Sequence, residues 1–238
     1  MKDQIRWQYN EFNHVGKDYS KPDEVRQYDS RHSDFRDIEN ESNAVLDNLG
    51  LGKNDILIDF GSGTGTFAIQ AALRCAAVYA VDVSQVMIEY AKIKAKKADV
   101  SNIRFFHRGF LTYEHDGLAA DVIVTTFAFH HLPDFWKGIA LQRMYHMLKP
   151  DGQLFIHDVI LEEEHAIEKI AAFIKIMAAA GGDFLKQDTE AHFREEYSTY
   201  DWVMDGLLLR SGFIIKSKHV QGGVIGTYYC TKKLPTAQ

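Results

Sequence analysis

The residues with the clearest chemical spacing stand in "ILIDFGSGTGTFAIQ", residues 56–70, where an apolar run ends in an acid and then breaks into alternating glycines. Glycine has no side chain, so a glycine-rich turn after a strand lets the backbone approach a ligand closely. Phosphate-binding loops and dinucleotide sites both use such a turn. The neighbours of the glycines therefore decide which ligand the turn admits.

Two of the known glycine turns do not fit these neighbours. A phosphate-binding Walker loop needs a lysine directly after its last glycine, and no lysine follows Gly61 and Gly63 until Lys92. A dinucleotide fingerprint needs a third glycine where this chain has Thr66. Asp59 also stands two residues before the first glycine, where it would repel an anionic pyrophosphate. The Walker interpretation fails, and an NAD-dependent oxidoreductase remains as a disfavoured alternative.

An acid at position 59 suits a ligand whose nearest group is cationic. S-adenosylmethionine (SAM) is such a ligand, because its methionine end carries an ammonium group and its sulfur is a sulfonium. The next apolar run ends in Asp82, whose carboxylate could accept hydrogen bonds from both ribose hydroxyls. Asp82 alone would suit NAD equally well, so only Asp59, G-x-G-x-G and Asp82 taken together favour SAM.

Several longer stretches resemble one known family. They are "ILIDFGSGTGTFAIQAA", "VYAVDVSQVMIEYAKIKA", "ADVIVTTFAFHHLPDF" and "MYHMLKPDGQLFIHDVI". Over about residues 40–160 the chain resembles the class I SAM-dependent methyltransferases, with most likeness to the subgroup of ubiquinone/menaquinone C-methyltransferases. The terminal "GFIIKSKHV" and "TYYCTKK" are similar to the last hairpin of that family. These motifs indicate fold and cofactor but not substrate, because they recur in enzymes that methylate carbon, oxygen, nitrogen and sulfur.

The resemblance implies roles for residues at the ends of the first two strands. Asp59 and the turn from Gly61 to Gly65 would hold the methionine end of SAM, Asp82 would bind the ribose, and Val83 would lie against the adenine. The set expected here is Asp59, Phe60, Gly61, Ser62, Gly63, Gly65, Asp82 and Val83.

Further cofactor contacts are implied after the third and fourth strands. Members of the family often have a Gly-Asp pair after the third strand, whose carboxylate meets the adenine amino group. This chain has Gly109 and Phe110 there, so the acid is missing and Phe110 can offer only its backbone and ring. Thr126 and Phe127 match the position that passes beneath the methyl group.

Methyl transfer is an in-line displacement, so the protein mainly needs to align the nucleophile and exclude water. A general base is needed only when the acceptor is a poor nucleophile. "FHHLPD" places His130 and His131 after the fourth strand, where either could be that base or could simply cap the next helix. His157 and Asp158 follow the fifth strand, where they could face the acceptor pocket, but we expect a solvated strand end there. The histidines show no metal-binding spacing, so no metal is expected.

The elements that must position these residues alternate along the chain. Strands are expected at 55–60, 77–82, 102–107, 121–126 and 153–160, and helices at 37–51, 64–74, 84–98, 135–148 and 199–210. This alternation predicts a parallel sheet with right-handed crossovers. "QGG" between apolar runs 213–220 and 224–231 predicts a closing hairpin. The resemblance implies an α/β, Rossmann-like, doubly wound seven-stranded sheet in the order 3-2-1-4-5-7-6, with strand 7 antiparallel and a helical insertion.

We expect one methyltransferase domain over residues 1–238. Its parts are an N-terminal arm at 1–36, a SAM-binding core at 37–160, a helical insertion at 161–200, and a last helix and hairpin at 201–238. Tyr9, Tyr19 and Tyr28 could form a flap over the cofactor, with Tyr19 and Tyr28 in the binding set, or could merely anchor the arm. The apolar stripe of the insertion could be ordinary packing or a homodimer face.

Composition narrows the partners. A formal net charge of -6 argues against nucleic acid, and no apolar run is long enough for a membrane span. The start of the chain lacks an apolar signal core, which favours a cytoplasmic protein. Cys75 and Cys230 are expected to be small core residues. The expected reaction is transfer of a methyl group from SAM to a small, partly apolar acceptor, leaving S-adenosylhomocysteine (SAH); a non-catalytic SAM-binding protein is the other alternative.

Overall fold

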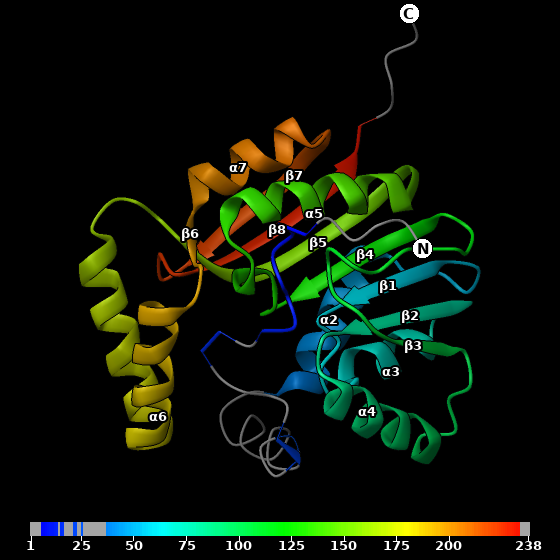
Figure 1. Cartoon of the computed structure of the whole chain (residues 1–238), viewed down its shortest axis with the longest axis horizontal. Helices are drawn as coiled ribbons and strands as arrows, with labels where there is room; N and C mark the ends of the chain where they lie inside the picture. The colour runs from blue at the N-terminus through cyan, green and yellow to red at the C-terminus, as the bar shows by residue number, and fades with distance from the viewer. Residues whose placement is uncertain (1–5, 14, 17–20, 23–24, 26–36, 234–238) are drawn as a thin grey trace, which may run out of the picture.

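The computed structural model describes residues 6–13, 15–16, 21–22, 25 and 37–233, arranged around one central sheet (Figure 1). Its strands are β1 (Ile56–Phe60), β2 (Ala77–Asp82), β3 (Ile103–His107), β4 (Ala120–Thr126), β5 (Leu148–Leu161), β6 (Thr199–Tyr200), β7 (Phe213–Gln221) and β8 (Ile225–Lys232). They run in the order β3-β2-β1-β4-β5-β8-β7, with β6 paired to β5. The expected order is confirmed; the predicted strands 6 and 7 are β7 and β8 because the two-residue β6 was not foreseen.

The directions of the strands also agree with the prediction. The pairs from β3 through β5 are parallel, whereas β8 runs antiparallel to both β5 and β7. Parallel strands bring their carboxyl ends to one edge of the sheet, which is where ligands bind in doubly wound folds. The residues expected to bind the cofactor therefore meet at this edge.

Helices cover both faces of the sheet. They are α2 (Ile38–Leu49), α3 (Thr66–Ala72), α4 (Gln85–Lys97), the 3₁₀ helix η1 (Phe129–His131), α5 (Asp134–Met147), α6 (Ala166–Glu195) and α7 (Asp201–Arg210). In Figure 1, α5 and α7 lie on one side of the sheet and α2, α3 and α4 lie on the other, while α6 stands beyond the end of β5. No helix in the described part of the chain has the length and apolar character needed to cross a membrane.

The apolar runs of the strands explain the two layers of core. Side chains alternate between the faces of a strand, so Leu57 and Ile58 of β1 enter different cores. Ile58 shares its core with Leu141 of α5 and Leu208 of α7, and Leu57 shares its core with Leu46 of α2. A strand that is buried on both faces is apolar at nearly every position, as the sequence of β1 indicates. Both cysteines are free and buried, as expected.

Two helix ends follow their local signals. Ser84 caps α4, since its hydroxyl accepts a hydrogen bond from the backbone N–H of Met87 at 3.2 Å. Gly50 ends α2 with a φ of 63°, a left-handed conformation that favours glycine. These short-range features fix where α2 ends before β1 and where α4 begins after β2.

The stretch "LKPDG", residues 148–152, lies just before the strand expected at 153–160 and forms a bulge inside β5. The pairing of β5 with β4 passes from Ala120 and Leu148 to Val122 and Gln153, so the intervening residues 149–152 leave the ladder. The expected strand at 153–160 therefore lies within β5, which begins earlier, at Leu148.

The helical insertion is broken in its middle. Gly181 and Gly182 have non-helical dihedral angles, and the chain then resumes a helix up to Glu195. The two glycines thus interrupt the helical insertion without ending it. Phe173 and Phe193, one from each half of α6, pack against the core at the end of β5. The second half therefore returns the chain to the sheet at Glu196.

Candidate cofactor pocket and its polar neighbours

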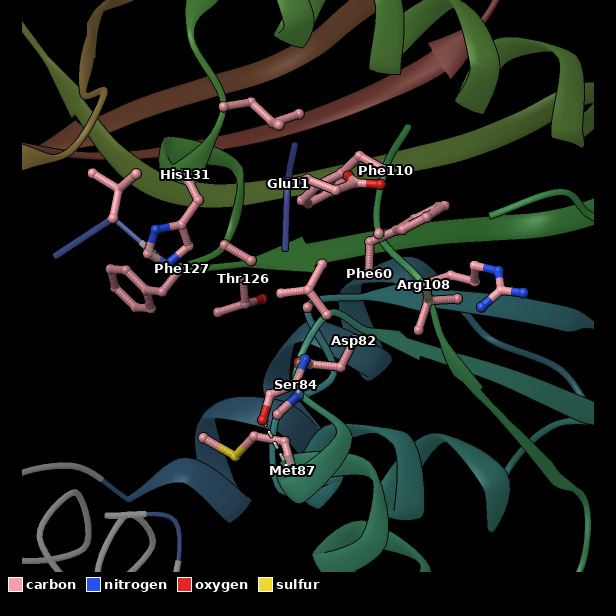
Figure 2. Close-up of a pocket in the computed structure, with 18 of the residues that line it drawn as sticks. Glu11, Phe60, Asp82, Ser84, Met87, Arg108, Phe110, Thr126, Phe127 and His131 are labelled. Atoms are coloured by element: carbon pink, nitrogen blue, oxygen red, sulfur yellow. Dashed lines mark hydrogen bonds between the residues drawn. The ribbon is translucent and has the colours of Figure 1, made fainter. Parts of the chain in front are cut away.

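A pocket opens at the carboxyl ends of β1, β2 and β4 (Figure 2). Of the residues expected to bind cofactor or acceptor, its walls include Phe60, Gly61, Gly63, Asp82, Val83, Gly109, Phe110, Thr126, Phe127 and His131. Asp59, Ser62, Gly65 and His130 do not line it. Tyr19 and Tyr28 lie outside the described residues. The fold therefore brings residues from four separate stretches to one pocket.

The first glycine of the turn is needed for close packing. Gly61 has a φ of 73°, and a Cβ atom there would lie only 2.2 Å from the Cβ of Ala128. Its backbone N–H and that of Ser62 both donate to the carbonyl oxygen of Val81, at 2.8 and 3.1 Å. A side chain at position 61 would thus push the end of β1 away from the loop after β4.

Asp82 has a structural task that the sequence did not reveal. One carboxylate oxygen accepts a hydrogen bond from the backbone N–H of Gly63 at 2.8 Å, and the other accepts one from Ser84 at 2.7 Å. The acid therefore ties the glycine turn of β1 to the start of α4. Carboxylate oxygens can each accept more than one hydrogen bond, so a ribose can be bound in addition.

Asp59 is a buried acid whose negative charge needs a positively charged partner. Its side chain is only 3 % exposed, and its Oδ2 has no hydrogen-bond partner among the described residues. Burial raises its pKa from the ordinary 3.8 to about 7, and the negative charge of Asp82 adds to the effect. A buried acid with an unpaired oxygen favours a cationic partner. The residues present thus fit the ammonium end of SAM, although Asp59 lies outside the pocket wall.

The position of the missing adenine acid is occupied by an aromatic residue. The ring of Phe110 stacks on Phe60, with centroids 5.1 Å apart and planes 18° apart. Phe110 is thus fixed by the core beneath the pocket, and its edge meets Phe129. The stretch after the third strand thus supplies no acid at this end of the pocket.

An acid from the N-terminal arm lies there instead. The carboxylate of Glu11 accepts hydrogen bonds from the backbone N–H of Leu111 at 2.9 Å and from the hydroxyl of Thr112 at 2.7 Å. A Cβ on Gly109 would come within 2.4 Å of this carboxylate, so Gly109 makes room for it. Burial raises the pKa of Glu11. Because position 11 is so distant in sequence, no local signal indicated this contact.

The arm also reaches the histidines. The hydroxyl of Tyr9 donates to the carbonyl oxygen of His131 at 3.3 Å, and its ring meets Tyr197 edge-on. His131 lines the pocket, with a side chain that is one-third exposed. Tyr9 and Glu11 together hold the described part of the arm along the pocket.

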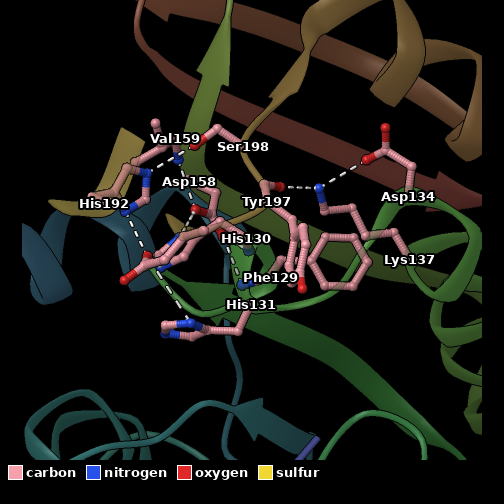
Figure 3. Close-up of polar contacts among 11 residues, drawn as sticks. Phe129, His130, His131, Asp134, Lys137, Asp158, Val159, His192, Tyr197 and Ser198 are labelled. Atoms are coloured by element: carbon pink, nitrogen blue, oxygen red, sulfur yellow. Dashed lines mark hydrogen bonds and ion pairs between the residues drawn. The ribbon is translucent and has the colours of Figure 1, made fainter. Parts of the chain in front are cut away.

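His130 does not line the pocket, and its ring lies in a buried polar network (Figure 3). Its Nδ1 contacts Asp158 and its Nε2 lies 3.0 Å from Glu196. Asp158 also accepts hydrogen bonds from the backbone N–H groups of Phe129 and Val159, both at 2.7 Å. The expectation of a solvated strand end at Asp158 was wrong: this side chain is buried because it holds the 3₁₀ turn that follows β4.

Opposite charges stabilise this network. Burial alone would lower the pKa of His130, but the carboxylates of Asp158 and Glu196 outweigh it and raise the pKa to about 9. Burial opposes ionisation of both acids as well, and His130 keeps the pKa of each well below its usual value. Burial and the charge of His130 lower the pKa of His131. The two adjacent histidines therefore differ: without a bound cation, the surrounding carboxylates favour the protonated form of His130, whereas burial favours the neutral form of His131.

Comparisons with known proteins find sequence similarity to methyltransferases. Residues 57–152 match a family model described as a methyltransferase domain. An uncharacterized methyltransferase of Geobacillus kaustophilus is 28 % identical over 189 residues, covering 79 % of this chain and 81 % of the relative. An uncharacterized methyltransferase of Bacillus mycoides is 29 % identical over 157 residues, covering 66 % of this chain and 68 % of the relative.

Solved structures share the fold at low sequence identity. A SAM-dependent methyltransferase of Aquifex aeolicus superposes with a TM-score of 0.62 at 20 % identity, covering 89 % of this chain and 98 % of that one. A phosphoethanolamine N-methyltransferase 2 of Haemonchus contortus, solved with SAH, gives a TM-score of 0.68 at 16 % identity, covering 90 % of this chain and 58 % of that one.

The strand order and the pocket at the ends of β1, β2 and β4 define the class I methyltransferase fold. With the matching domain and the methyltransferase relatives, they identify the chain as a SAM-dependent methyltransferase. SAM is accordingly its cofactor, and an NAD-dependent oxidoreductase is not favoured. The comparisons show neither the narrower quinone subgroup nor a homodimer.

Proposed function

We propose that this enzyme transfers the methyl group of SAM to a small, partly apolar acceptor bound beside His131, and releases SAH. One observation carries the proposal: a single pocket joins a polar half at Gly63 and Asp82 to a largely apolar half at Phe127 and Leu132. The polar half suits the sugar and amino acid parts of SAM. The apolar half suits an acceptor from which water must be excluded.

The residues of the polar half would share the cofactor between them. Asp82 would accept hydrogen bonds from the ribose hydroxyls, Val83 and Phe110 would flank the adenine, and the ammonium group would be drawn towards Asp59. When bound, SAM supplies a methyl group on a positively charged sulfur, which is a strong electrophile. The main contributions of the protein are therefore to orient the two reactants and to exclude water.

We assign His131, and not His130, to contact with the acceptor. The assignment is supported by the side chain of His131, which lies in the pocket wall near Phe127 (Figure 2). His130 would be a positioning residue, because it is buried between Asp158 and Glu196. A hydrogen bond from the acceptor to His131 would hold its nucleophilic atom in line with the methyl group.

The quinone C-methyltransferase subgroup remains our narrower proposal for the acceptor. It is supported by the apolar residues Phe127, Ala128 and Leu132 beside His131, which fit a ring better than a charged amine. An acceptor screen that detects SAH release would test it. The proposal fails if hydroxylated aromatic rings give no SAH while an aliphatic amine does.

Cofactor binding is tested by calorimetric titration with SAH. Asp82→Ala should weaken binding by at least about tenfold, because one lost hydrogen bond to a charged group is worth about 1.5 kcal/mol or more. Asp183→Ala is the matched control, since Asp183 is exposed on α6. Equal affinity of the Asp82 variant and the parent would refute the ribose assignment. Absence of SAH formation with every acceptor would favour a non-catalytic SAM-binding protein.

A further inference from the structure

A set of side chains with metal-ligand chemistry lies beside the pocket. It consists of His130, His192 and Glu196, called here the His-His-Glu cluster, and one ligand atom from each lies within 4.8 Å of the others. The Oε2 atom of Glu196 is 3.0 Å from Nε2 of His130 and 2.6 Å from Nδ1 of His192. Three potential ligands from two distant parts of the chain thus converge on one point.

The two imidazole rings are held with their inner nitrogens facing this point. His130 contacts Asp158 through its outer nitrogen, Nδ1. The outer nitrogen of His192, Nε2, lies 2.8 Å from the hydroxyl of Ser198 (Figure 3). In metal sites, such partners on the second ring nitrogen fix its orientation and tautomer. The cluster has this support on both rings.

Burial and charge also favour a cation. The side chain of Glu196 is 7 % exposed and that of Asp158 is 2 % exposed. Buried carboxylates need positive charge nearby. A divalent ion bound by neutral imidazoles would match the charge of these two acids, whereas a proton on His130 supplies a single charge. Lys137 is also close to Asp158, but it forms an ion pair with Asp134 at 2.9 Å.

The cluster has the arm on one side and His131, which lines the pocket, on another. Gly16 of the arm lies against Oε1 of Glu196, where a Cβ would come within 2.0 Å. On the side of the pocket, Nδ1 of His131 is 4.0 Å from Oε2 of Glu196. A bound ion could therefore take a fourth ligand from His131 or from an acceptor in the pocket. Three protein ligands with one open position are typical of catalytic zinc sites.

We propose that the His-His-Glu cluster binds one divalent transition-metal ion, with zinc as the preferred metal for two imidazoles and a carboxylate. The binding of the ion stands on the cluster alone. Its role rests on the proposed function: an ion at the acceptor end would favour an acceptor with an oxygen or sulfur atom as ligand. The competing account is a network without metal, in which a protonated His130 donates to both Asp158 and Glu196.

The test uses the full-length chain without a histidine tag. Metal content is measured by mass spectrometry after purification, and zinc is then titrated into chelator-treated protein by calorimetry. We expect one zinc ion per chain and a loss of affinity of at least about 100-fold in His192→Ala. His219→Ala is the matched control, because His219 is exposed on β7. Binding to that variant should equal binding to the parent.

A milder variant keeps the test sound if His192→Ala fails to fold. Ser198→Ala removes only the partner of the outer nitrogen and should weaken zinc about 10- to 100-fold. Cobalt substitution adds a spectroscopic readout, since ligation by these side chains gives visible absorption bands. Absence of zinc binding in the parent, or equal binding by parent and both variants, overturns the inference. SAH titration of the same proteins separates this result from a failure of the proposed function.

Discussion

Asp59 offers the sharpest test of how the site is built, because it is buried without a full set of partners. Its pKa is raised from 3.8 to about 7, mainly by burial. At 1.36 kcal/mol for each tenfold change in proton affinity, the ionised carboxylate costs the folded chain about 4 kcal/mol. This penalty is absent below pH 3.8 and complete above about pH 7, so it lowers stability as the pH rises through this range.

Replacement by asparagine removes the charge but keeps the shape. An unpaired buried amide costs about 1–3 kcal/mol, so Asp59→Asn should raise the free energy of unfolding of the cofactor-free protein at pH 8 by a net ~1–3 kcal/mol. At pH 5 only about 1.6 kcal/mol of the penalty remains, because the pH is only slightly above the pKa of the unfolded chain, and the cost of the unpaired amide offsets it, so the gain should vanish. Urea unfolding at both pH values measures the difference, with Asp183→Asn as the matched control on the surface.

Cofactor binding should change in the opposite direction. The ammonium group of SAH favours ionised Asp59, so affinity in the parent should increase as the pH rises from 6 to 8. The asparagine variant should lose this pH dependence and bind SAH at least about tenfold more weakly at pH 8. If Asp59→Asn is less stable than the parent at pH 8, or if it binds SAH as tightly, the assignment of Asp59 is wrong.

Three further substitutions address other parts of the site. Gly61→Ala should lower the free energy of unfolding, measured in urea, by about 2–4 kcal/mol, because its Cβ would meet Ala128 and its φ of 73° is unfavourable for alanine. Gly222→Ala is the control: its Cβ would lie in open space and its φ is 60°, so it should cost only the backbone strain. Equal losses in the two variants would contradict the packing argument. Glu11→Ala should weaken SAH binding by about tenfold in calorimetry, because the arm loses its bonds to Leu111 and Thr112; unchanged affinity would show that the arm does not shape the pocket. His131→Asn should reduce the rate of SAH release with an accepted substrate by about 10²-fold while SAH affinity stays within about twofold, and a parallel loss of both would place His131 in cofactor binding instead.

The cofactor half of the site was largely predictable from local patterns. The residues at the ends of β1 and β2 stand in short motifs, and parallel strands necessarily bring such ends together. The sequence could not indicate that Asp82 also accepts hydrogen bonds from Gly63 and Ser84, because these bonds depend on where the fold places the start of α4. Asp59 was expected to contact the cofactor directly, whereas the structure buries it behind the pocket wall. Its negative charge would still attract the ammonium group of SAM.

The acceptor half depends on contacts between distant segments. The sequence interpretation treated His130 and His131 alike, yet the fold turns one into the pocket and the other towards Asp158 and Glu196. No spacing rule could have joined His192 to His130, because they come from a long insertion and from the loop after β4. Their meeting follows from the break in α6, which returns the chain to the sheet.

The sequence by itself determined the alternation of strands and helices, the strand order through its resemblance, the caps at Ser84 and Gly50, and the cofactor class. These features depend on neighbours along the chain, where the periodicity of apolar residues and the freedom of glycine act directly. Only the tertiary structure decided that Glu11 lies against Gly109 and Leu111, that Asp158 is buried, and that a His-His-Glu cluster exists. Such contacts are set by the packing of elements far apart in sequence, so no local pattern encodes them.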